Sequence, residues 1–297
     1  MIRISFPILL AATCIMASCK DTIEVDFREG KEYIVIGGRI TNENFYHPIT
    51  ITRSTHITST EAPQTVTNAR VKVTDSNGNV YNYQHYAQGE YESLTYYEGE
   101  PGVTYNMEVK VDLDNDGIYE IFTASDIMRS NAEVDRIKLE PYKLLSKELT
   151  MVLIWGRLPE TKRENDPGYC FNIIVGSLDD YKPYSDMMLM NEELNDNLML
   201  DSLPTFSIDL NNKEYEDKFE AGNLVEFKIL SPSEQYYDFL RASKENTTSN
   251  IPVYGGPPAN SSTNIRQTGG TKTPVTGFFA ACSESKIYTI LERQSGK

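Results

Sequence analysis

Three carboxylates at alternate positions are the first candidates for metal ligands. The run DLDNDG at residues 112–117 follows the pattern D-x-D-x-D-G that opens calcium-binding loops. Carboxylates two residues apart can converge on one hard cation, and the glycine permits a sharp turn. The twelfth position of such a loop requires a bidentate glutamate, but Thr123 stands there. The sequence therefore favours a hairpin tip over a calcium site formed by Asp112, Asp114 and Asp116, although both can hold at once.

The four cysteines could take part in two kinds of chemistry, lipid attachment and disulfide formation. Cys14 and Cys19 lie near the N-terminus, whereas Cys170 and Cys282 lie far from it. In an oxidising compartment the last two thiols either form a disulfide or stay buried without one, and the sequence leaves both alternatives open. The deciding quantity is the separation of their α-carbons, which must lie within ~7 Å for a bridge.

The first 18 residues have the composition of an export signal peptide. Arg3 gives a positive start, and the apolar run from Ile4 to Met16 is shorter than the ~20 residues that span a bilayer. Two small residues then precede Cys19 directly, and this arrangement resembles the bacterial lipobox. The resemblance implies cleavage by signal peptidase II and attachment of acyl chains such as palmitate to Cys19. The alternative is an ordinary cleavage site with an unmodified cysteine.

Two or more acyl chains would hold the protein stably at a membrane, at ~0.8 kcal/mol per buried CH₂ group. No later run reaches 18 apolar residues, so we expect the rest of the chain to lie outside the bilayer, joined to the anchor by a linker at residues 19–31. Lys20-Asp21, with Glu24 and Asp26, loosely resembles the export signal of Bacteroidota surface lipoproteins. We therefore expect an outer-membrane location, and display on the cell surface or on the periplasmic face stays open.

The composition is acidic and carries none of the common catalytic signatures. The formal net charge of −15 disfavours nucleic acid and anionic membrane surfaces as partners. The chain has no G-x-S-x-G, H-E-x-x-H, phosphate loop or dinucleotide fingerprint, and no zinc-ligand spacing joins His47, His56 and His85. We therefore expect a non-enzymatic protein. A surface hydrolase acting on glycan or peptide stays an alternative, because a carboxylate pair is recognised by its spatial separation.

Alternation of apolar and polar residues predicts an all-β chain. In residues 32–130, seven short strands separated by turn signals predict an immunoglobulin-like β-sandwich. The clearest alternation runs from Tyr105 to Val111, and Asn77-Gly78 is a strong hairpin signal. The tyrosines are dense enough for an aromatic platform that binds a sugar or peptide. Strand formation and cross-strand packing are nevertheless the favoured roles of Tyr81, Tyr83, Tyr86, Tyr91, Tyr96 and Tyr97.

Residues 131–297 are predicted to form a second β-rich domain that carries one α-helix. The helix is expected near 232–245, with Ser231 as the residue that caps its N-terminus and Pro232 in its first turn. Residues 246–274 are rich in Asn, Ser, Thr, Gly and Pro and predict a long loop, the favoured place for ligand contacts. Strands are predicted at 134–139, 149–155, 170–175, 206–210, 224–230, 275–282 and 286–291.

The order of several short motifs resembles one known family. The chain carries YIVIGGRIT, NARVKVTD, GEYES and GVTYNMEV, followed later by SPSEQYYDFLRA, PVYGGPPANSSTNI and TGFFAACS. Together these resemble Bacteroidota outer-membrane lipoproteins catalogued only as a domain of unknown function, whose members are typically encoded beside TonB-dependent receptors. The resemblance implies a lipid-anchored binding or accessory subunit that works with such a receptor in nutrient capture or uptake. It carries over no functional residue except Cys19, and an adhesive or scaffolding module stays a further alternative.

Overall fold

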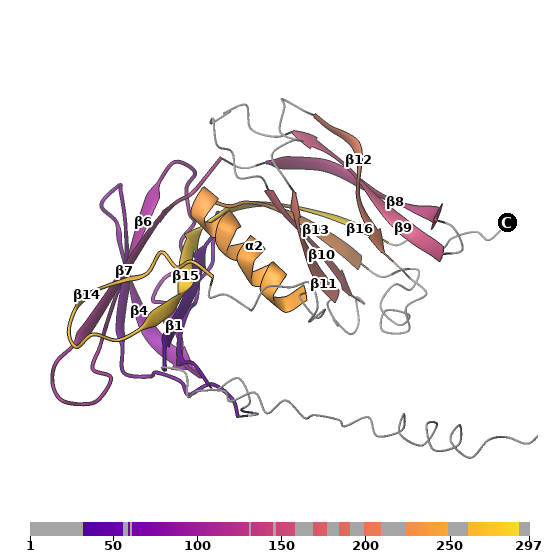
Figure 1. The fold of residues 1–297 in the computed structure, drawn as a ribbon. Helices are drawn as coiled ribbons and strands as arrows, with labels where there is room; N and C mark the ends of the chain where they lie inside the picture. Colours follow the sequence, from indigo (N-terminus) through magenta and orange to yellow (C-terminus); the bar gives the residue numbers. More distant parts are fainter. Residues whose placement is uncertain are drawn as a thin grey trace, which may run out of the picture. The chain divides into compact units, whose positions relative to one another are not determined.

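A computed structural model of the protein contains three β-sheets and, among the described residues, one α-helix (Figure 1). It describes residues 32–55, 59, 61–130, 132–144, 147–157, 169–176, 184–190, 199–208, 222, 224–248 and 261–290. The prediction of a strongly β-rich chain is therefore confirmed. The elements are β1 (Ile34–Ile40), β2 (Ile49–Arg53), β3 (Arg70–Asp75), β4 (Val80–Ala87), β5 (Glu90–Ser93), β6 (Thr104–Val111), β7 (Glu120–Ile127), β8 (Glu133–Leu144), β9 (Lys147–Arg157), β10 (Tyr169–Gly176), β11 (Tyr184–Met190), β12 (Met199–Ile208), β13 (Leu224–Ser231), α2 (Glu234–Thr248), β14 (Arg266–Gly269), β15 (Val275–Ala281) and β16 (Ser283–Ile290).

Nine strands form the largest sheet, in the order β14-β7-β6-β3-β4-β5-β2-β1-β15. Side chains alternate across this sheet as the sequence predicted. On β6, Tyr105, Met107 and Val109 are buried, whereas Asn106 between them is exposed. The apolar side chains of these strands form the main core, and the opposite face of the same strands is left polar.

Two strands near the C-terminus complete this sheet. β15 pairs in parallel with β1, from Ile34 opposite Val275 to Ile40 opposite Ala281, and β14 pairs with β7. The sheet is single and nearly barrel-shaped, so the two facing sheets of an immunoglobulin-like sandwich over residues 32–130 are not confirmed. The sequence predicts the strand at 275–282 within the second domain and places residues 266–269 in a loop, because a pairing between segments so far apart leaves no local pattern in the sequence.

The parallel pairing of β1 with β15 depends on Gly277. Its φ is +98°, and a Cβ at this position would collide with the carbonyl oxygen of Ile36 on the neighbouring strand. Only glycine combines this backbone conformation with such a close approach. The Asn77-Gly78 hairpin is also confirmed, since Gly78 has a φ of +93° and the Asp75 carboxylate accepts the backbone N–H groups of Asn77 and Asn79.

The remaining strands form a four-stranded sheet, β11-β10-β13-β16, and a three-stranded sheet, β12-β9-β8. Helix α2 follows β13 and confirms the predicted helix, but the predicted cap is wrong by two residues. Ser231 is the last residue of β13, and Ser233 is the cap, because its hydroxyl accepts the N–H of Tyr236 at 3.2 Å. The predicted loop 246–274 is shorter than expected, since it contains the end of α2 and the whole of β14.

No helix of the described part of the chain is long and apolar enough to cross a bilayer. The predicted signal peptide, the predicted linker and Cys19 lie outside the described residues. Their assignment therefore stays a prediction from the sequence.

Candidate functional site

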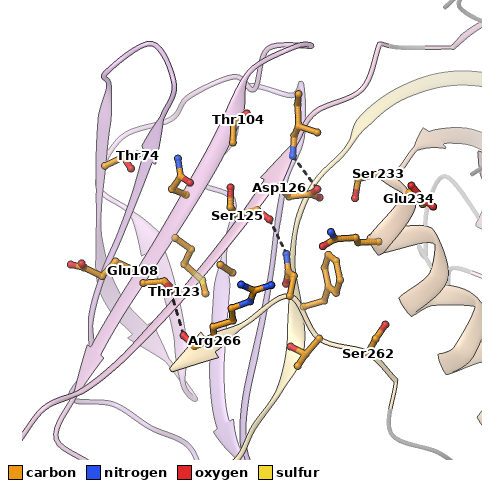
Figure 2. Close-up of a pocket in the computed structure, with 18 of the residues that line it drawn as sticks. Thr74, Thr104, Glu108, Thr123, Ser125, Asp126, Ser233, Glu234, Ser262 and Arg266 are labelled. Carbon is orange, nitrogen blue, oxygen red and sulfur yellow. Dashed lines mark hydrogen bonds between the residues drawn. The ribbon is translucent and has the colours of Figure 1, made fainter. Parts of the chain in front are cut away.

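A groove of about 1320 Å³ lies between the polar face of strands β3, β6 and β7 and the first turn of α2 (Figure 2). Strand alternation supplies its floor. Because Tyr105 and Met107 point into the core, Thr104, Asn106 and Glu108 point the other way, into the groove. The floor is therefore made of hydroxyl, amide and charged groups.

The charges on the floor are partly neutralised by one another. Lys72 on β3 and Lys110 on β6 both contact the same carboxylate oxygen of Glu108, at 3.1 and 3.2 Å. Partial burial alone would raise the pKa of Glu108, but the hydrogen bonds from the two lysines outweigh it and lower that pKa. Glu108 is thus held ionised at neutral pH.

Asn264 forms one wall of the groove, between β7 and β15. Its Oδ1 accepts the N–H of Phe279 at 3.1 Å, and its Nδ2 donates to the carbonyl oxygen of the same residue at 2.7 Å. The Nδ2 also donates to the carbonyl oxygen of Ser125 on β7, at 3.2 Å (Figure 2). One side chain therefore links the two strands where no ladder joins them.

Asp126 joins three elements beside this wall. It lies on β7 and is 8% exposed. Its Oδ2 accepts the N–H of Ala281 on β15 at 2.8 Å, and the hydroxyl of Ser233, the cap of α2, also donates to it. Burial raises the pKa of Asp126 to about 6, although these hydrogen bonds and one from the N–H of Ile127 oppose the shift. All these donors are groups of the protein itself, so the side chain of Asp126 links β7, β15 and the start of α2.

Arg266 on β14 provides the positive charge in the groove that is most available to a ligand. Within the described part of the chain its guanidinium makes no hydrogen bond or ion pair, and Figure 2 shows it pointing into the groove. Thr123, Ser125 and Ser262, which carry hydroxyl groups, line the same groove. A fork of five N–H donors beside several hydroxyls suits a ligand rich in oxygen acceptors. No motif in the sequence predicts this groove, because its lining comes from six separate segments of the chain.

The three predicted metal ligands do converge in space. One carboxylate oxygen from each of Asp112, Asp114 and Asp116 lies within 4.8 Å of the others, in the connection between β6 and β7. Both oxygens of Asp112 accept backbone N–H groups of the same turn, from Asp116 at 3.1 Å and from Gly117 at 3.0 Å. Asn115 and Gly117 have φ values of 60° and 85°. The hairpin tip is therefore present, the three acids fit a hard cation, and calcium stays a prediction.

The two predicted disulfide partners lie on strands that are not neighbours. Cys170 on β10 pairs with Leu230 of β13, and Leu230 pairs with Glu284 of β16. Cys282, which is fully buried, comes just before β16. A bridge would have to cross β13, and two strand spacings amount to roughly 9.6 Å, beyond the ~7 Å between α-carbons that a disulfide allows. The side chain of Cys170 is outside the described part of the structure, so the disulfide stays a prediction that this geometry disfavours.

Most of the clustered tyrosines pack against the core, as expected. Tyr83, Tyr91 and Tyr97 are buried, and Tyr81 stacks on Tyr97 with ring centroids 3.7 Å apart. Tyr86 and Tyr96 are exposed, at 67% and 55%. Tyr96 also meets Phe45 and Tyr46 at the surface, a contact between distant segments that the sequence analysis did not find.

His47 lies beneath these surface aromatics and is 2% exposed. Its Nε2 lies 2.9 Å from the carbonyl oxygen of Tyr97, and its Nδ1 lies 3.4 Å from the backbone N–H of Thr41. This pair of contacts assigns the proton to Nε2, which donates, while Nδ1 accepts. Burial lowers the pKa of His47 to about 4. His47 is therefore a neutral core residue.

Comparison with protein families gives one match. Residues 20–287 match a family described as "Domain of unknown function (DUF4249)". No curated protein matches the chain. The match begins at the residue directly after Cys19 and includes strands of all three sheets, ending within β16.

Proposed function

Because the chain belongs to this family of unknown function, whose match begins at the residue after Cys19, we propose that it is a lipid-anchored outer-membrane lipoprotein of the Bacteroidota type. It binds a ligand and works as an accessory subunit of a TonB-dependent receptor in nutrient capture or uptake. The small residues before Cys19 support the anchor, since they provide the lipobox. The family resemblance supports the receptor as partner.

The polar groove is the observation that carries the binding function. It is large enough for a ligand of several rings or residues, and its floor offers hydroxyl, amide and charged groups that point outward from a rigid sheet. Within the described residues the guanidinium of Arg266 has no hydrogen-bond or ion-pair partner, so its donors are available to a ligand there. A pre-formed polar surface on strands recognises a ligand through hydrogen bonds without reordering.

The groove supports binding better than hydrolysis. Asp126 has the raised pKa expected of a general acid, about 6. Its carboxylate, however, already accepts the N–H groups of Ala281 and Ile127 and the hydroxyl of Ser233. It is also 8% exposed, so a substrate has little access to it. Because this carboxyl group makes its hydrogen bonds with groups of the protein itself, its role is structural. The proposed function therefore assigns it no catalytic step.

The anchor is tested by replacing the acylated residue. We expect C19S to lose labelling by a palmitate analogue and to leave the membrane fraction, whereas wild type is labelled and membrane-bound. C14S is the matched control, because it removes a nearby cysteine of the same signal region and keeps the lipobox. Membrane association of C19S without labelling, together with an unlabelled wild type, would contradict the anchor.

The groove and the receptor are tested on the full-length tagged protein purified from native membranes. We expect a TonB-dependent receptor and a small ligand to co-purify with wild type. The variant S125W places a large ring on the exposed floor of the groove and should lose the small ligand, as measured by native mass spectrometry. E61W adds the same bulk at an exposed position outside the groove and should retain it. Retention of the ligand by S125W, or repeated absence of any membrane partner, would refute this function.

A further inference from the structure

A second surface of the protein has the properties of a binding site. Phe45 and Tyr46, which precede β2, meet Tyr96, which follows β5, and we call these three residues the aromatic platform. We propose that the aromatic platform binds a neutral sugar ring of a glycan. This proposal concerns a different surface from the groove and stands independently of the receptor partnership.

The three rings form a nearly continuous exposed surface. The rings of Tyr46 and Tyr96 have centroids 4.0 Å apart with an interplanar angle of 33°, and those of Phe45 and Tyr96 are stacked at 6.5 Å with an angle of 28°. Phe45 is 51% exposed and Tyr96 is 55% exposed. Tyr46 and Tyr96 cover part of each other's ring faces, and Phe45 and Tyr96 still expose about half of their side-chain surface. Large aromatic side chains that gather in this way at the surface mark a contact site more often than isolated ones do.

The backbone beneath the platform is fixed. Phe45 and Tyr97 exchange two backbone hydrogen bonds of 3.2 Å in an isolated bridge, which holds the two segments side by side. The carbonyl oxygen of Tyr46 accepts the N–H of Ser93 at 3.2 Å and its hydroxyl at 2.7 Å. The backbone segments that carry the rings are therefore held in place before any ligand arrives, which lowers the entropy lost on binding.

The imidazole beneath the platform is neutral. His47 meets the ring of Tyr97 at 4.6 Å and that of Phe45 at 6.5 Å, both edge to face. Because burial lowers its pKa to about 4, this imidazole carries no charge at neutral pH. His47 therefore adds no positive charge below the rings, although the guanidinium of Arg39 lies near enough to help lower the pKa of His47.

Polar groups border the rings. The phenols of Tyr46 and Tyr96 hydrogen-bond to each other, and the negative charge of Glu92 lies close enough to act on Tyr46; both effects raise the pKa of Tyr46. Flat aromatic faces pack against the C–H face of a pyranose, and phenol and carboxylate oxygens meet its hydroxyl groups. This combination of apolar face and oxygen-rich rim is the chemistry of sugar recognition.

Charge and area argue against the other occupants of an exposed aromatic surface. A chain of net charge −15 is repelled by anionic membranes and by acidic glycans. A stable protein partner needs roughly 1,200–2,000 Å² of total interface. Three aromatic side chains offer at most about 150–250 Å² each even when fully buried, and these three are half-buried already. A single sugar ring matches the size of the platform.

The proposal is tested by affinity electrophoresis of the full-length protein in detergent, in gels that contain neutral polysaccharides of glucose, xylose or mannose units. We expect at least one of them to retard the protein. Y96A and F45A should each weaken that binding at least tenfold, and Y96F, which keeps the ring, should weaken it far less. Y86A is the matched control, since Tyr86 is 67% exposed and makes no ring contact with the described residues, and it should bind as wild type does.

Three results would overturn the proposal. The first is that none of the neutral polysaccharides retards the protein. The second is that only an anionic polysaccharide does so. The third is that Y96A and Y86A change binding equally. Melting temperatures of the variants separate loss of binding from loss of fold. The groove variant S125W should retain the retardation, so failure of the groove and failure of the platform are distinguishable.

Discussion

The side-chain amide of Asn264 makes with the backbone of Phe279 both hydrogen bonds that a neighbouring strand would make. The oxygen accepts the N–H at 3.1 Å and the nitrogen donates to the carbonyl oxygen at 2.7 Å. A second N–H of the same amide reaches the carbonyl oxygen of Ser125 at 3.2 Å. The free edge of β15 is thus satisfied by a side chain, and the nearly barrel-shaped sheet closes toward β7 without a further strand.

This closure predicts a large loss of stability in N264A. Phe279 is fully buried, so its N–H and carbonyl groups would lose their partners away from water. Each such group costs about 1–3 kcal/mol, and we expect a loss of roughly 2–4 kcal/mol in the free energy of unfolding. N106A is the matched control, because Asn106 is exposed and its side chain makes no hydrogen bond with the described residues. Urea denaturation gives both values, and equal losses would show that Asn264 does not close the sheet.

A second prediction concerns the parallel pairing of β1 and β15. In G277A the new methyl group must move the carbonyl of Ile36, and the residue must also keep a φ of +98°. We expect at least about 3 kcal/mol of destabilisation, because backbone collision adds to conformational strain. Gly78 has a similar φ, +93°, but open space around it, so G78A should cost only about 1 kcal/mol. If both variants unfold at the same urea concentration, the strain of a positive φ alone accounts for the destabilisation, and the predicted collision with the Ile36 carbonyl contributes nothing.

Local patterns in the sequence predict the strands well, and pairing between distant strands poorly. The alternation from Tyr105 to Val111 fixes which side chains face the core, because the period of a strand is two residues. The partner of Val275–Ala281 is not encoded locally. β15 contains the TGFF motif, and the strand that pairs with it, β1, lies near the other end of the chain. Its assignment to a separate domain followed from sequence order, and tertiary pairing overrides that order.

The candidate sites also divide into one that local spacing in the sequence predicts and others that form only when distant segments pack together. Asp112, Asp114 and Asp116 come together as predicted, because their spacing within one turn is short-range information. The groove combines strands β3, β6 and β7 with the start of α2, and no motif links these segments. Tyr96 lay within the tyrosine cluster of the sequence, but its stacking partner Tyr46 is far away along the chain. A site made by packing becomes visible only once the pairing of strands is known.

A third prediction follows from the buried imidazole of His47. Burial lowers its folded pKa from 6.5 to about 4, so the unfolded chain binds a proton between these values and the folded protein does not. The contribution of His47 to stability should therefore fall as pH drops from 6.5 to 4, by up to about 3 kcal/mol. H47Q keeps an N–H donor for the carbonyl of Tyr97 and should remove this contribution, so that its stability rises relative to that of wild type as pH drops. H85Q, at an exposed position of β4, should retain the contribution of His47. Unfolding measured across this pH range decides between them, and an unchanged slope in H47Q would be contrary to the assignment.

The raised pKa of Asp126 predicts a change of stability with pH of the opposite sign over the same pH range. Burial raises its folded pKa from 3.8 to about 6, so the folded protein holds a proton that the unfolded chain has released. This contribution to stability is present below pH 3.8 and is lost as pH rises through 6, by about 3 kcal/mol. Because His47 acts in the other direction, the wild type should show a nearly flat profile. D126N made in the H47Q background should remove the remaining slope, and D114N, at an exposed carboxylate, should leave it. A persistent slope in the double variant would exclude Asp126 as its source.

The last prediction separates the two roles of the β6–β7 connection. Both carboxylate oxygens of Asp112 accept backbone N–H groups, whereas the carboxylate of Asp114 receives no hydrogen bond from the described residues. In EDTA, D112A should therefore lower the free energy of unfolding by about 1–2 kcal/mol and D114A should not change it. If the loop also holds calcium, added calcium raises the melting temperature of wild type but not of D114A. A wild type that does not respond to calcium leaves the connection as a hairpin tip alone, and equal losses for D112A and D114A in EDTA would contradict the hydrogen bonds that define that tip.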